Sequence, residues 1–153
     1  MGKEIERKYL VDVEKWGGKG TPVEIKQAYL SIENGKIIRI RTSGKKAYLT
    51  IKGNLMGITR DEFEYPVPYA DALQLMNFSV SFPVEKTRYI FPSGEIKWEI
   101  DVFHGLNDGL IIAEVELTSE DQEFEKPDWI LEEVSHDERY FNFNLSLRPF
   151  QKW

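Results

Sequence analysis

Charged side chains of both signs recur at every second residue in several short segments of this sequence. The acidic pairs are Glu4-x-Glu6, Glu62-x-Glu64 and Glu114-x-Glu116, and the basic pairs are Arg39-x-Arg41 and Lys86-x-Arg88. Residues two apart in a β-strand project from the same face of the sheet. A face that gathers carboxylates can hold a hard divalent cation, and a face that gathers Lys and Arg can bind the oxygens of a polyanion.

The alternation extends beyond these pairs, and apolar residues fill the positions between the charges. Ile38 and Ile40 flank Arg39, and Trp98 and Ile100 flank Glu99. The charged positions in this pattern are Glu4, Glu6, Lys8, Arg39, Arg41, Lys52, Arg60, Glu62, Glu64, Lys86, Arg88, Glu99, Asp101, Glu114 and Glu116.

The segments that carry these charges are short, rich in β-branched and aromatic residues, and separated by turn signals such as Asn34-Gly35 and Ser43-Gly44. Short strands at even spacing joined by such turns are typical of an antiparallel sheet or barrel. We predict eight strands, over residues 4–11, 27–33, 36–43, 46–53, 59–66, 85–91, 95–103 and 110–118.

Few segments favour helix. Residues 69–77 follow Pro68 and carry Ala, Leu and Met, which predicts a short helix. Ser119-x-x-Gln122 has the form of a capping box and predicts the start of a helical turn. Residues 137–147 place aromatic residues at helical spacing, which predicts a C-terminal helix that packs on the sheet. Residues 12–24 give no clear assignment.

Two arrangements of the strands fit the alternation. The charges can lie on solvated faces of an open sheet, or the sheet can close into a barrel with apolar residues outward and charges inward. About eight strands leave a lumen able to hold one small ligand. A single charge stranded in a dry interior costs several kcal/mol, so a charged lumen stabilises a fold poorly. It suits a polyanion bound by the basic groups together with divalent cations bound by the carboxylates.

Composition narrows the function classes. The chain has 153 residues, a formal charge of −6 and no cysteine, which excludes disulfides and thiolate metal sites. Its two histidines, His104 and His136, lack zinc spacing, so the carboxylates favour Mg²⁺ or Mn²⁺. The acidic balance argues against nucleic acid as a partner. We find no apolar run of membrane-spanning length and no signal peptide, and therefore expect one cytoplasmic domain over residues 1–153.

The charged motifs resemble the CYTH family of triphosphate tunnel metalloenzymes. The resemblance runs in order along nearly the whole chain, and it continues in Asp137-x-Arg139-Tyr140-x-Asn142. It implies an α+β, mainly β fold: a closed eight-stranded antiparallel β-barrel, open at both ends as a tunnel, with a few flanking helices. It also implies an enzyme that acts on a small-molecule triphosphate with Mg²⁺ or Mn²⁺. The motifs are Glu4-x-Glu6-x-Lys8, Arg39-x-Arg41, Thr50-x-Lys52, Arg60-x-Glu62-x-Glu64, Lys86-x-Arg88-Tyr89, Asp101-Val102-Phe103 and Glu114-x-Glu116.

The resemblance assigns roles residue by residue. Glu64 is implied to contact a metal or a water molecule. For catalysis we hypothesise that a second metal ion, or a carboxylate such as Glu114 or Glu64, orients the attacking water. Lys8 would serve as a general acid or as an electrostatic partner of the glutamates. Arg139 either reaches the site or makes a structural pair. The metal-binding positions are Glu4, Glu6, Asp101, Glu114 and Glu116, and the triphosphate-binding positions are Lys8, Arg39, Arg41, Lys52, Arg60, Lys86 and Arg88.

Several functions remain open at this stage. The first is hydrolysis of inorganic triphosphate to pyrophosphate and phosphate, because no extra segment suggests a pocket for a base. A single aromatic residue such as Tyr29, Tyr48, Trp98 or Phe103 would nevertheless suffice for a thiamine-triphosphatase or a class IV adenylate cyclase. A non-catalytic polyphosphate or nucleotide binder and a plain barrel are further alternatives, and a homodimer is left open.

Overall fold

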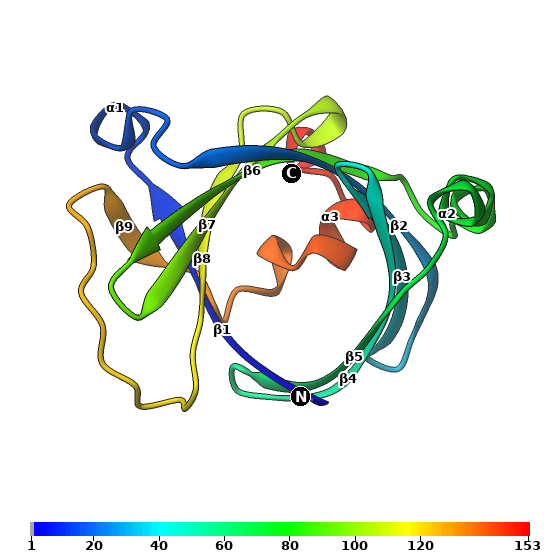
Figure 1. Cartoon of the computed structure of the whole chain (residues 1–153), viewed down its shortest axis with the longest axis horizontal. Helices are drawn as coiled ribbons and strands as arrows, with labels where there is room; N and C mark the ends of the chain where they lie inside the picture. Colours follow the sequence, from blue (N-terminus) through cyan, green and yellow to red (C-terminus); the bar gives the residue numbers. More distant parts are fainter. Residues whose placement is uncertain (1) are drawn as a thin grey trace.

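The central element is a single antiparallel sheet that closes into a barrel (Figure 1). The computed structural model describes residues 2–153. Eight strands pair in the order β5-β4-β3-β2-β6-β7-β8-β1, and pairing of β5 with β1 closes the ring. This confirms the predicted closed eight-stranded barrel, to which the structure adds a ninth strand. The strands are β1 (Gly2–Val11), β2 (Thr21–Glu33), β3 (Lys36–Ser43), β4 (Lys46–Met56), β5 (Thr59–Pro66), β6 (Val84–Ser93), β7 (Ile96–Phe103), β8 (Ile111–Glu116) and β9 (Ile130–Glu133).

Strand β1 forms the seam of the barrel by pairing with three strands. On one edge, its residues Glu6–Leu10 pair with β8. On the other edge, Gly2–Ile5 pair with β5, and Tyr9 and Val11 then pair with β9. The additional strand therefore occupies the part of the β1 edge that β5 does not reach, which leaves fewer unpaired backbone groups there.

The segment 12–24, which the sequence left unassigned, contains a short helix followed by the start of β2. Helix α1 (Val13–Trp16) begins where the Asp12 side chain accepts a hydrogen bond from the Lys15 backbone amide. It ends at Gly17, whose φ of 61° suits glycine. Strand β2 begins at Thr21, six residues before the predicted start, because Thr21–Gln27 continue the ladder with β6.

Helix α2 (Tyr69–Leu75) and the 3₁₀ turn η1 (Met76–Phe78) match the helix predicted over 69–77. They lie outside the ring (Figure 1), where Ala72 packs with the outward-facing Ala28, Ile40 and Ala47. The helical turn predicted at Ser119 does not form. The Gln122 side chain instead accepts hydrogen bonds from the backbone and hydroxyl of Thr118, and the chain makes only a turn.

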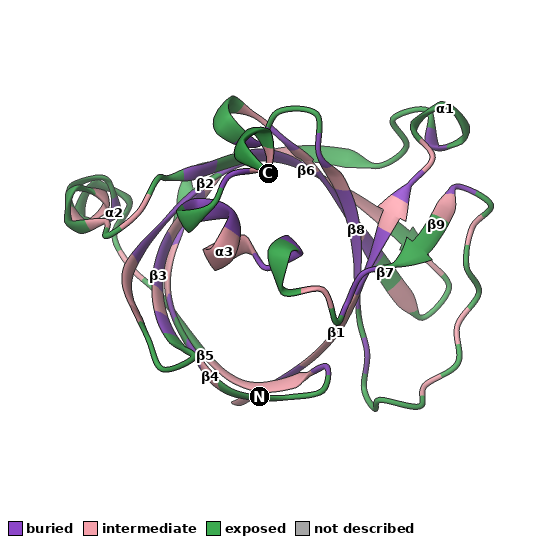
Figure 2. Ribbon diagram, turned by 180° about the vertical axis from the view of Figure 1, so that it is seen from behind, coloured by how far each residue is buried: buried purple, intermediate pink, exposed green. Residues whose placement is uncertain are grey.

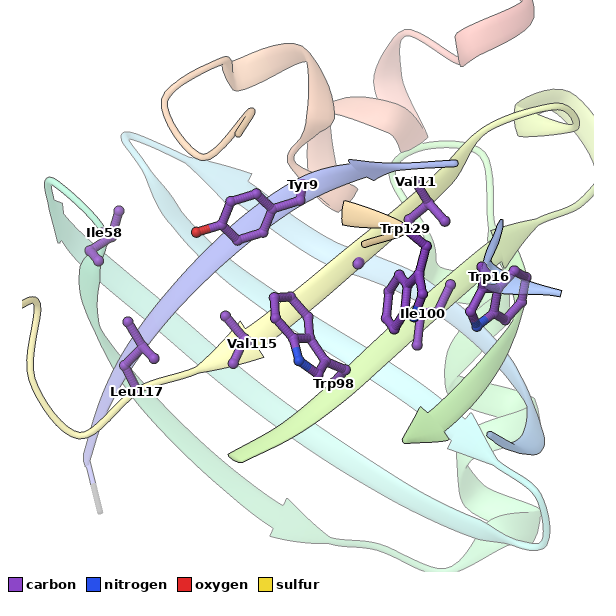
Figure 3. Close-up of a cluster of buried hydrophobic side chains, with 10 residues drawn as sticks. Tyr9, Val11, Trp16, Ile58, Trp98, Ile100, Val115, Leu117 and Trp129 are labelled. Carbon is purple, nitrogen blue, oxygen red and sulfur yellow. The ribbon is translucent and has the colours of Figure 1, made fainter. Parts of the chain in front are cut away.

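An aromatic core lies on the outer face of β1, β7 and β8. Figure 3 shows Tyr9, Trp98 and Trp129 in this cluster, and Trp98 makes edge contacts with both of the others. The segment that carries Trp129 and β9 covers this face, so the apolar half of the alternation is removed from water.

The C-terminal segment occupies one end of the barrel, and it lies inside the ring in Figures 1 and 2. It is broken into η3 (Glu138–Tyr140), α3 (Asn142–Leu147) and η4 (Phe150–Lys152). A further 3₁₀ turn, η2 (Gly105–Asn107), lies earlier in the chain, between β7 and β8. The single helix predicted over 137–147 is interrupted because Phe141 is extended, with φ −66° and ψ 132°.

This segment packs on the sheet as predicted, but from the inside. Leu145 is fully buried among inward-facing Ile37, Val84 and Phe103, which are apolar because this end of the barrel is filled. The expectation of a tunnel open at both ends is therefore wrong for one end. Within residues 2–153 no helix combines the length and apolar character required to cross a membrane.

Candidate functional site

The barrel interior holds a cavity of about 140 Å³ that is lined mainly by charged side chains. Every site residue predicted from the sequence lines it except Asp101, which lies directly behind its wall. Alternation on closely spaced strands therefore brings residues from all parts of the chain together. The lining residues are Glu4, Glu6, Lys8, Tyr29, Ile37, Arg39, Arg41, Lys52, Arg60, Glu62, Glu64, Lys86, Arg88, Glu99, Glu114, Glu116, Asn142 and Phe143.

Burial divides the cavity into an inner floor and an outer rim. The floor holds most of the cations together with the buried carboxylates Glu4 and Glu114. Five of the seven basic residues, among them Lys86 and Arg88, are buried, whereas the carboxylates Glu64 and Glu116 are exposed. Glu62 and Glu99 are intermediate. The cavity thus has a predominantly basic floor and a carboxylate rim at its solvent-facing side.

The floor is organised around Asp101. Arg88 donates to both Asp101 oxygens, at 2.7 and 2.9 Å, and the Lys86 ammonium lies 2.8 Å from Asp101 Oδ2. Burial lowers the pKa of Lys86 to about 7, and the neighbouring cations Arg88 and Arg41 act in the same direction. The Asp101 carboxylate acts to raise this pKa but only partly offsets the decrease. Asp101 therefore orients two cations, and binding a metal would require it to release one of them.

A second group joins β1, β4 and β5 beside the floor. The Lys52 ammonium contacts Glu4 at 3.1 Å and Glu62 at 3.1 Å, and the Arg60 guanidinium reaches Glu4 at 3.4 Å. Burial acts to raise the pKa of Glu4, but Lys52 and Arg60 outweigh it and lower this pKa to about 2. Glu4 is thus a carboxylate anion across the physiological pH range.

Lys8 and Glu114 form the next pair, 3.0 Å apart and both buried. Burial acts to lower the pKa of the Lys8 ammonium, but the Glu114 and Glu6 carboxylates outweigh it and raise this pKa. Lys8 and Arg88 in turn hold the pKa of Glu114 well below its usual value, against the effect of burial. Lys8 is therefore protonated and Glu114 ionised, which suits Lys8 as a donor to an anion.

Two carboxylates of the cavity are not fully balanced by cations. Burial, together with the nearby Glu114 and Glu4, raises the pKa of Glu6 to about 8. Partial burial and the carboxylates Glu4, Glu62 and Glu99 raise the pKa of Glu116 in the same way. A site where carboxylates repel one another in this manner favours an added cation.

These carboxylates fit a hard divalent cation in the chemistry of their donor atoms, since all are oxygen ligands without thiol or imidazole. In the part of the chain that the structure describes, no three acidic or histidine side chains converge closely enough to hold an ion. The reason is that Glu4 and Glu114 point at Lys52 and Lys8. Binding a cation would require these side chains to turn from their basic partners.

Arg41 differs from the other basic residues of the cavity. Among those residues within 2–153, Arg41 alone forms no ion pair. Its Nε donates to the neutral Gln27 Oε1 at 2.8 Å. Burial and the adjacent Arg39 and Arg88 lower the pKa of Arg41 to about 10. This guanidinium is therefore the cation in the cavity whose charge is least compensated.

The remaining predicted residue on the floor side is Arg39, which bonds Thr50 and reaches Glu64 at 3.4 Å. Glu64 also accepts a hydrogen bond from Thr50, at 2.9 Å. Arg139 lies away from the cavity, where it pairs with Asp137 and is mostly exposed. Of the two alternatives for Arg139, the structure therefore shows the structural pair and not a residue of the site.

Sequence reasoning assigned no site role to several lining residues. Glu62 and Glu99 belong to the same period-two alternation as the predicted site residues, so the sequence pattern does mark them. Asn142 and Phe143 reach the cavity only because the C-terminal segment enters the barrel. Gln27 carries no sequence signal, because a lone glutamine in a strand is ordinary. Of the aromatic residues considered for a base pocket, Tyr29 lines the cavity, whereas Trp98 lies in the outer core.

Comparison with known proteins agrees with this geometry. A curated "Inorganic triphosphatase" from Acetivibrio thermocellus is 42% identical to this chain, and the alignment covers 100% of this chain and 99% of the relative. Another protein of that name, from Nitrosomonas europaea, is 38% identical over 94% of this chain and 97% of its own length. A crystal structure described as an inorganic triphosphatase superposes with a TM-score of 0.66 and 34% identity, and covers 94% of both chains.

The family model of the CYTH domain matches residues 2–148, which include every strand and all the cavity residues. The expectation drawn from the ordered motifs is thereby confirmed, and this chain belongs to the CYTH domain family.

Proposed function

We propose that this protein is a divalent-cation-dependent enzyme that hydrolyses inorganic triphosphate to pyrophosphate and phosphate. The observation that carries the proposal is the basic floor of the barrel, with its uncompensated Arg41 beneath a rim of carboxylates. A cavity of about 140 Å³ leaves room for a short phosphate chain. The names of the two curated relatives support the same substrate.

The basic residues would bind the phosphate oxygens by charge-assisted hydrogen bonds. Lys86, Arg88 and Arg41 occupy the floor, and the other proposed binding residues surround them. Phosphoryl transfer needs positioning and charge neutralisation more than covalent chemistry. The arrangement of cations on all sides of one cavity supplies both. The proposed triphosphate-binding set is Lys8, Arg39, Arg41, Lys52, Arg60, Lys86 and Arg88.

Glu4, Glu6, Glu114 and Glu116 would hold Mg²⁺ or Mn²⁺, with Asp101 joining if it releases a cation. When bound, such an ion supplies Lewis-acid polarisation of the phosphoryl oxygens. Glu114, which Lys8 and Arg88 hold ionised, and the rim residue Glu64, which already accepts a hydrogen bond from Thr50, would orient a water molecule. Lys8, protonated beside Glu114, would stabilise charge on the leaving group or return a proton to it.

A phosphate-release panel tests the proposal. The purified protein is incubated with inorganic triphosphate, ATP, GTP and thiamine triphosphate, each with Mg²⁺, Mn²⁺ or a chelator. We expect the highest kcat/KM for inorganic triphosphate, pyrophosphate as the second product, and no turnover with chelator. Preferred release from thiamine triphosphate, cyclic AMP formation from ATP, or chelator-resistant turnover would each contradict the proposal.

Variants connect that activity to the cavity. Replacing Arg41 or Glu116 by Ala removes a binding cation or a rim carboxylate, and we expect kcat/KM to fall by about 10²-fold or more. Glu95→Ala, at an exposed position away from the cavity, is the matched control. Wild-type activity in either cavity variant would remove that residue from the site.

Three further expectations accompany this function. We propose that residues 1–153 act as one domain, that the protein works in the cytoplasm, and that its substrate is a small molecule rather than nucleic acid. The oligomeric state follows from light scattering of the purified protein, which separates a monomer of 17.9 kDa from a homodimer.

A further inference from the structure

The neutral partner of Arg41 is part of a chain of two amides that crosses the floor of the cavity. Arg41 Nε donates to Gln27 Oε1 at 2.8 Å, and Gln27 Nε2 donates to Asn142 Oδ1 at 3.3 Å. The Lys86 ammonium donates to the same Asn142 oxygen at 2.9 Å. Gln27 lies in β2, and Asn142 is the first residue of α3. The two linked amides therefore connect the barrel wall to the C-terminal segment.

The orientation of both amides follows from the chemistry of the two ends. Arginine and lysine side chains only donate hydrogen bonds, so the atom facing each of them is an amide oxygen. Gln27 must then present its nitrogen to Asn142, whose oxygen receives both Gln27 and Lys86. Gln27 Nε2 also donates to the Tyr29 hydroxyl at 2.9 Å, which satisfies its second proton. Every bond in the chain is therefore consistent with the others.

Burial makes this arrangement rigid. Gln27 is completely buried, and an unsatisfied polar group there would cost about 1–3 kcal/mol. The amide can turn only by breaking its bonds to Arg41, Tyr29 and Asn142 together. The Arg41 guanidinium is thus held through its Nε, which leaves its two terminal nitrogens for a ligand in the cavity.

The neutrality of the partner matters for binding an anion. Lys8, Lys52 and Arg88 each face a carboxylate, which takes up part of their charge before a ligand arrives. An amide orients a guanidinium without cancelling its charge. A carboxylate at the position of Gln27 would instead form a buried ion pair with Arg41 and compete with phosphate oxygens.

We propose that Gln27 and Asn142 are positioning residues for triphosphate binding, a neutral amide pair that aims Arg41 and Lys86 into the cavity while leaving Arg41 uncompensated. This inference rests on the proposed function. It also gives the C-terminal segment a role in the site, because Asn142 lines the cavity and its Nδ2 has no hydrogen-bond partner among residues 2–153.

The test compares two nearly isosteric replacements of Gln27. Gln27→Met removes the acceptor for Arg41 and keeps the side-chain length, whereas Gln27→Glu keeps the acceptor and adds a negative charge. We expect KM for inorganic triphosphate to rise about tenfold in Gln27→Met and further in Gln27→Glu, with kcat within about threefold of wild type. Calorimetric titration of triphosphate in chelator should show the same order of weakened binding without turnover.

A second site and a control separate positioning from folding. Asn142→Leu, at a partly exposed position, should also raise KM about tenfold. Ser146→Ala alters a fully buried polar residue of the same helix that lies away from the cavity. It should lower the melting temperature and leave KM unchanged. Circular dichroism and melting temperature are recorded for every variant, so that Asn142→Leu carries the test if a Gln27 variant does not fold.

The outcomes distinguish this inference from the proposed function. The positioning role alone would be overturned if the wild-type protein hydrolyses triphosphate and the folded Gln27 and Asn142 variants have KM values within twofold of the wild-type value. A Gln27→Glu variant that binds triphosphate more tightly than Gln27→Met would overturn the argument from neutrality. A wild-type protein that neither binds nor hydrolyses triphosphate would overturn the proposed function and this inference with it.

Discussion

At the scale of single residues, the cavity is an array of groups whose protonation is set by their neighbours. Glu4 and Glu114 are ionised because cations lie within 3.1 Å of each. Glu6 lies between two other carboxylates, and its pKa is raised to about 8 as a result of burial, Glu114 and Glu4. The net charge of the cavity therefore changes near neutral pH, where Glu6 gains or loses its proton.

The raised pKa of Glu6 predicts how stability depends on pH without metal. Between about pH 4.5 and about pH 8, Glu6 keeps its proton in the folded protein but has released it in the unfolded chain. The free energy of unfolding should therefore fall as pH rises through this range, since the unfolded state binds fewer protons. Glu6→Gln removes this titration, and its melting temperature in chelator should fall less than that of wild type between pH 5.5 and pH 8.5.

The matched control for this measurement is Glu95→Gln, at an exposed position with no ion pair among the described residues. It should reproduce the wild-type dependence on pH. An unchanged pH dependence in Glu6→Gln would show that Glu6 is not the residue that couples protonation to folding.

At the scale of elements, the C-terminal segment decides the shape of the site. Strands alone would enclose a passage through the barrel, and α3 fills one end of it (Figure 2). The apolar inner residues at that end, such as Phe103 and Ile112, have a packing role because α3 covers them. The charged middle of the barrel is thereby reduced to a cavity with one main approach.

Packing of α3 is expected to contribute strongly to stability. Leu145 is fully buried inside the barrel, and Leu145→Ala should lower the free energy of unfolding by about 2–5 kcal/mol, through lost burial and the cavity left behind. Leu147→Ala on the same helix, at a side chain 52% exposed, should change it by less than about 0.5 kcal/mol. Urea denaturation measures both, and equal effects would mean that α3 does not depend on its inward face.

At the scale of the whole molecule, the barrel separates two environments. The outward alternate positions pack under α2, β9 and the segment before it, whereas the inward positions form the charged cavity. The formal charge of −6 describes the whole chain, and it conceals a basic floor inside the barrel. Net charge thus indicates little about the ligand that the interior can bind.

Binding in the barrel should stabilise the whole molecule, because strands from every part of the chain contribute to the cavity. A ligand at 100 times its Kd adds about 2.7 kcal/mol by mass action. At about 2–4 °C per kcal/mol for a chain of this size, imidotriphosphate, a poorly hydrolysed triphosphate analogue, should raise the melting temperature measurably in the presence of Mg²⁺. The Arg41→Ala variant should show a much smaller shift. A wild-type melting temperature that does not respond would indicate a barrel whose charges serve no ligand.

The sequence alone determined the fold class and most of the cavity. Alternation at period two places charges on one face of each strand whatever the register, and turns such as Asn34-Gly35 fix where strands reverse. Once the sheet closes, Glu4, Arg41 and Lys86 must share an interior, so their convergence was predictable from spacing. Closure itself was favoured because the alternative left an apolar face to be covered.

Only the tertiary structure decided what closes the barrel and what orients its cations. The position of α3 depends on packing between residues far apart in the chain, such as Leu145 and Phe103, which no local pattern specifies. The same holds for Gln27 and Asn142, which are 115 positions apart and meet only when α3 enters the barrel. Periodicity reports which face a residue occupies. It carries no information on which side chain across the interior will be its partner, and here that partner determines whether a buried cation is neutralised or left free for a ligand.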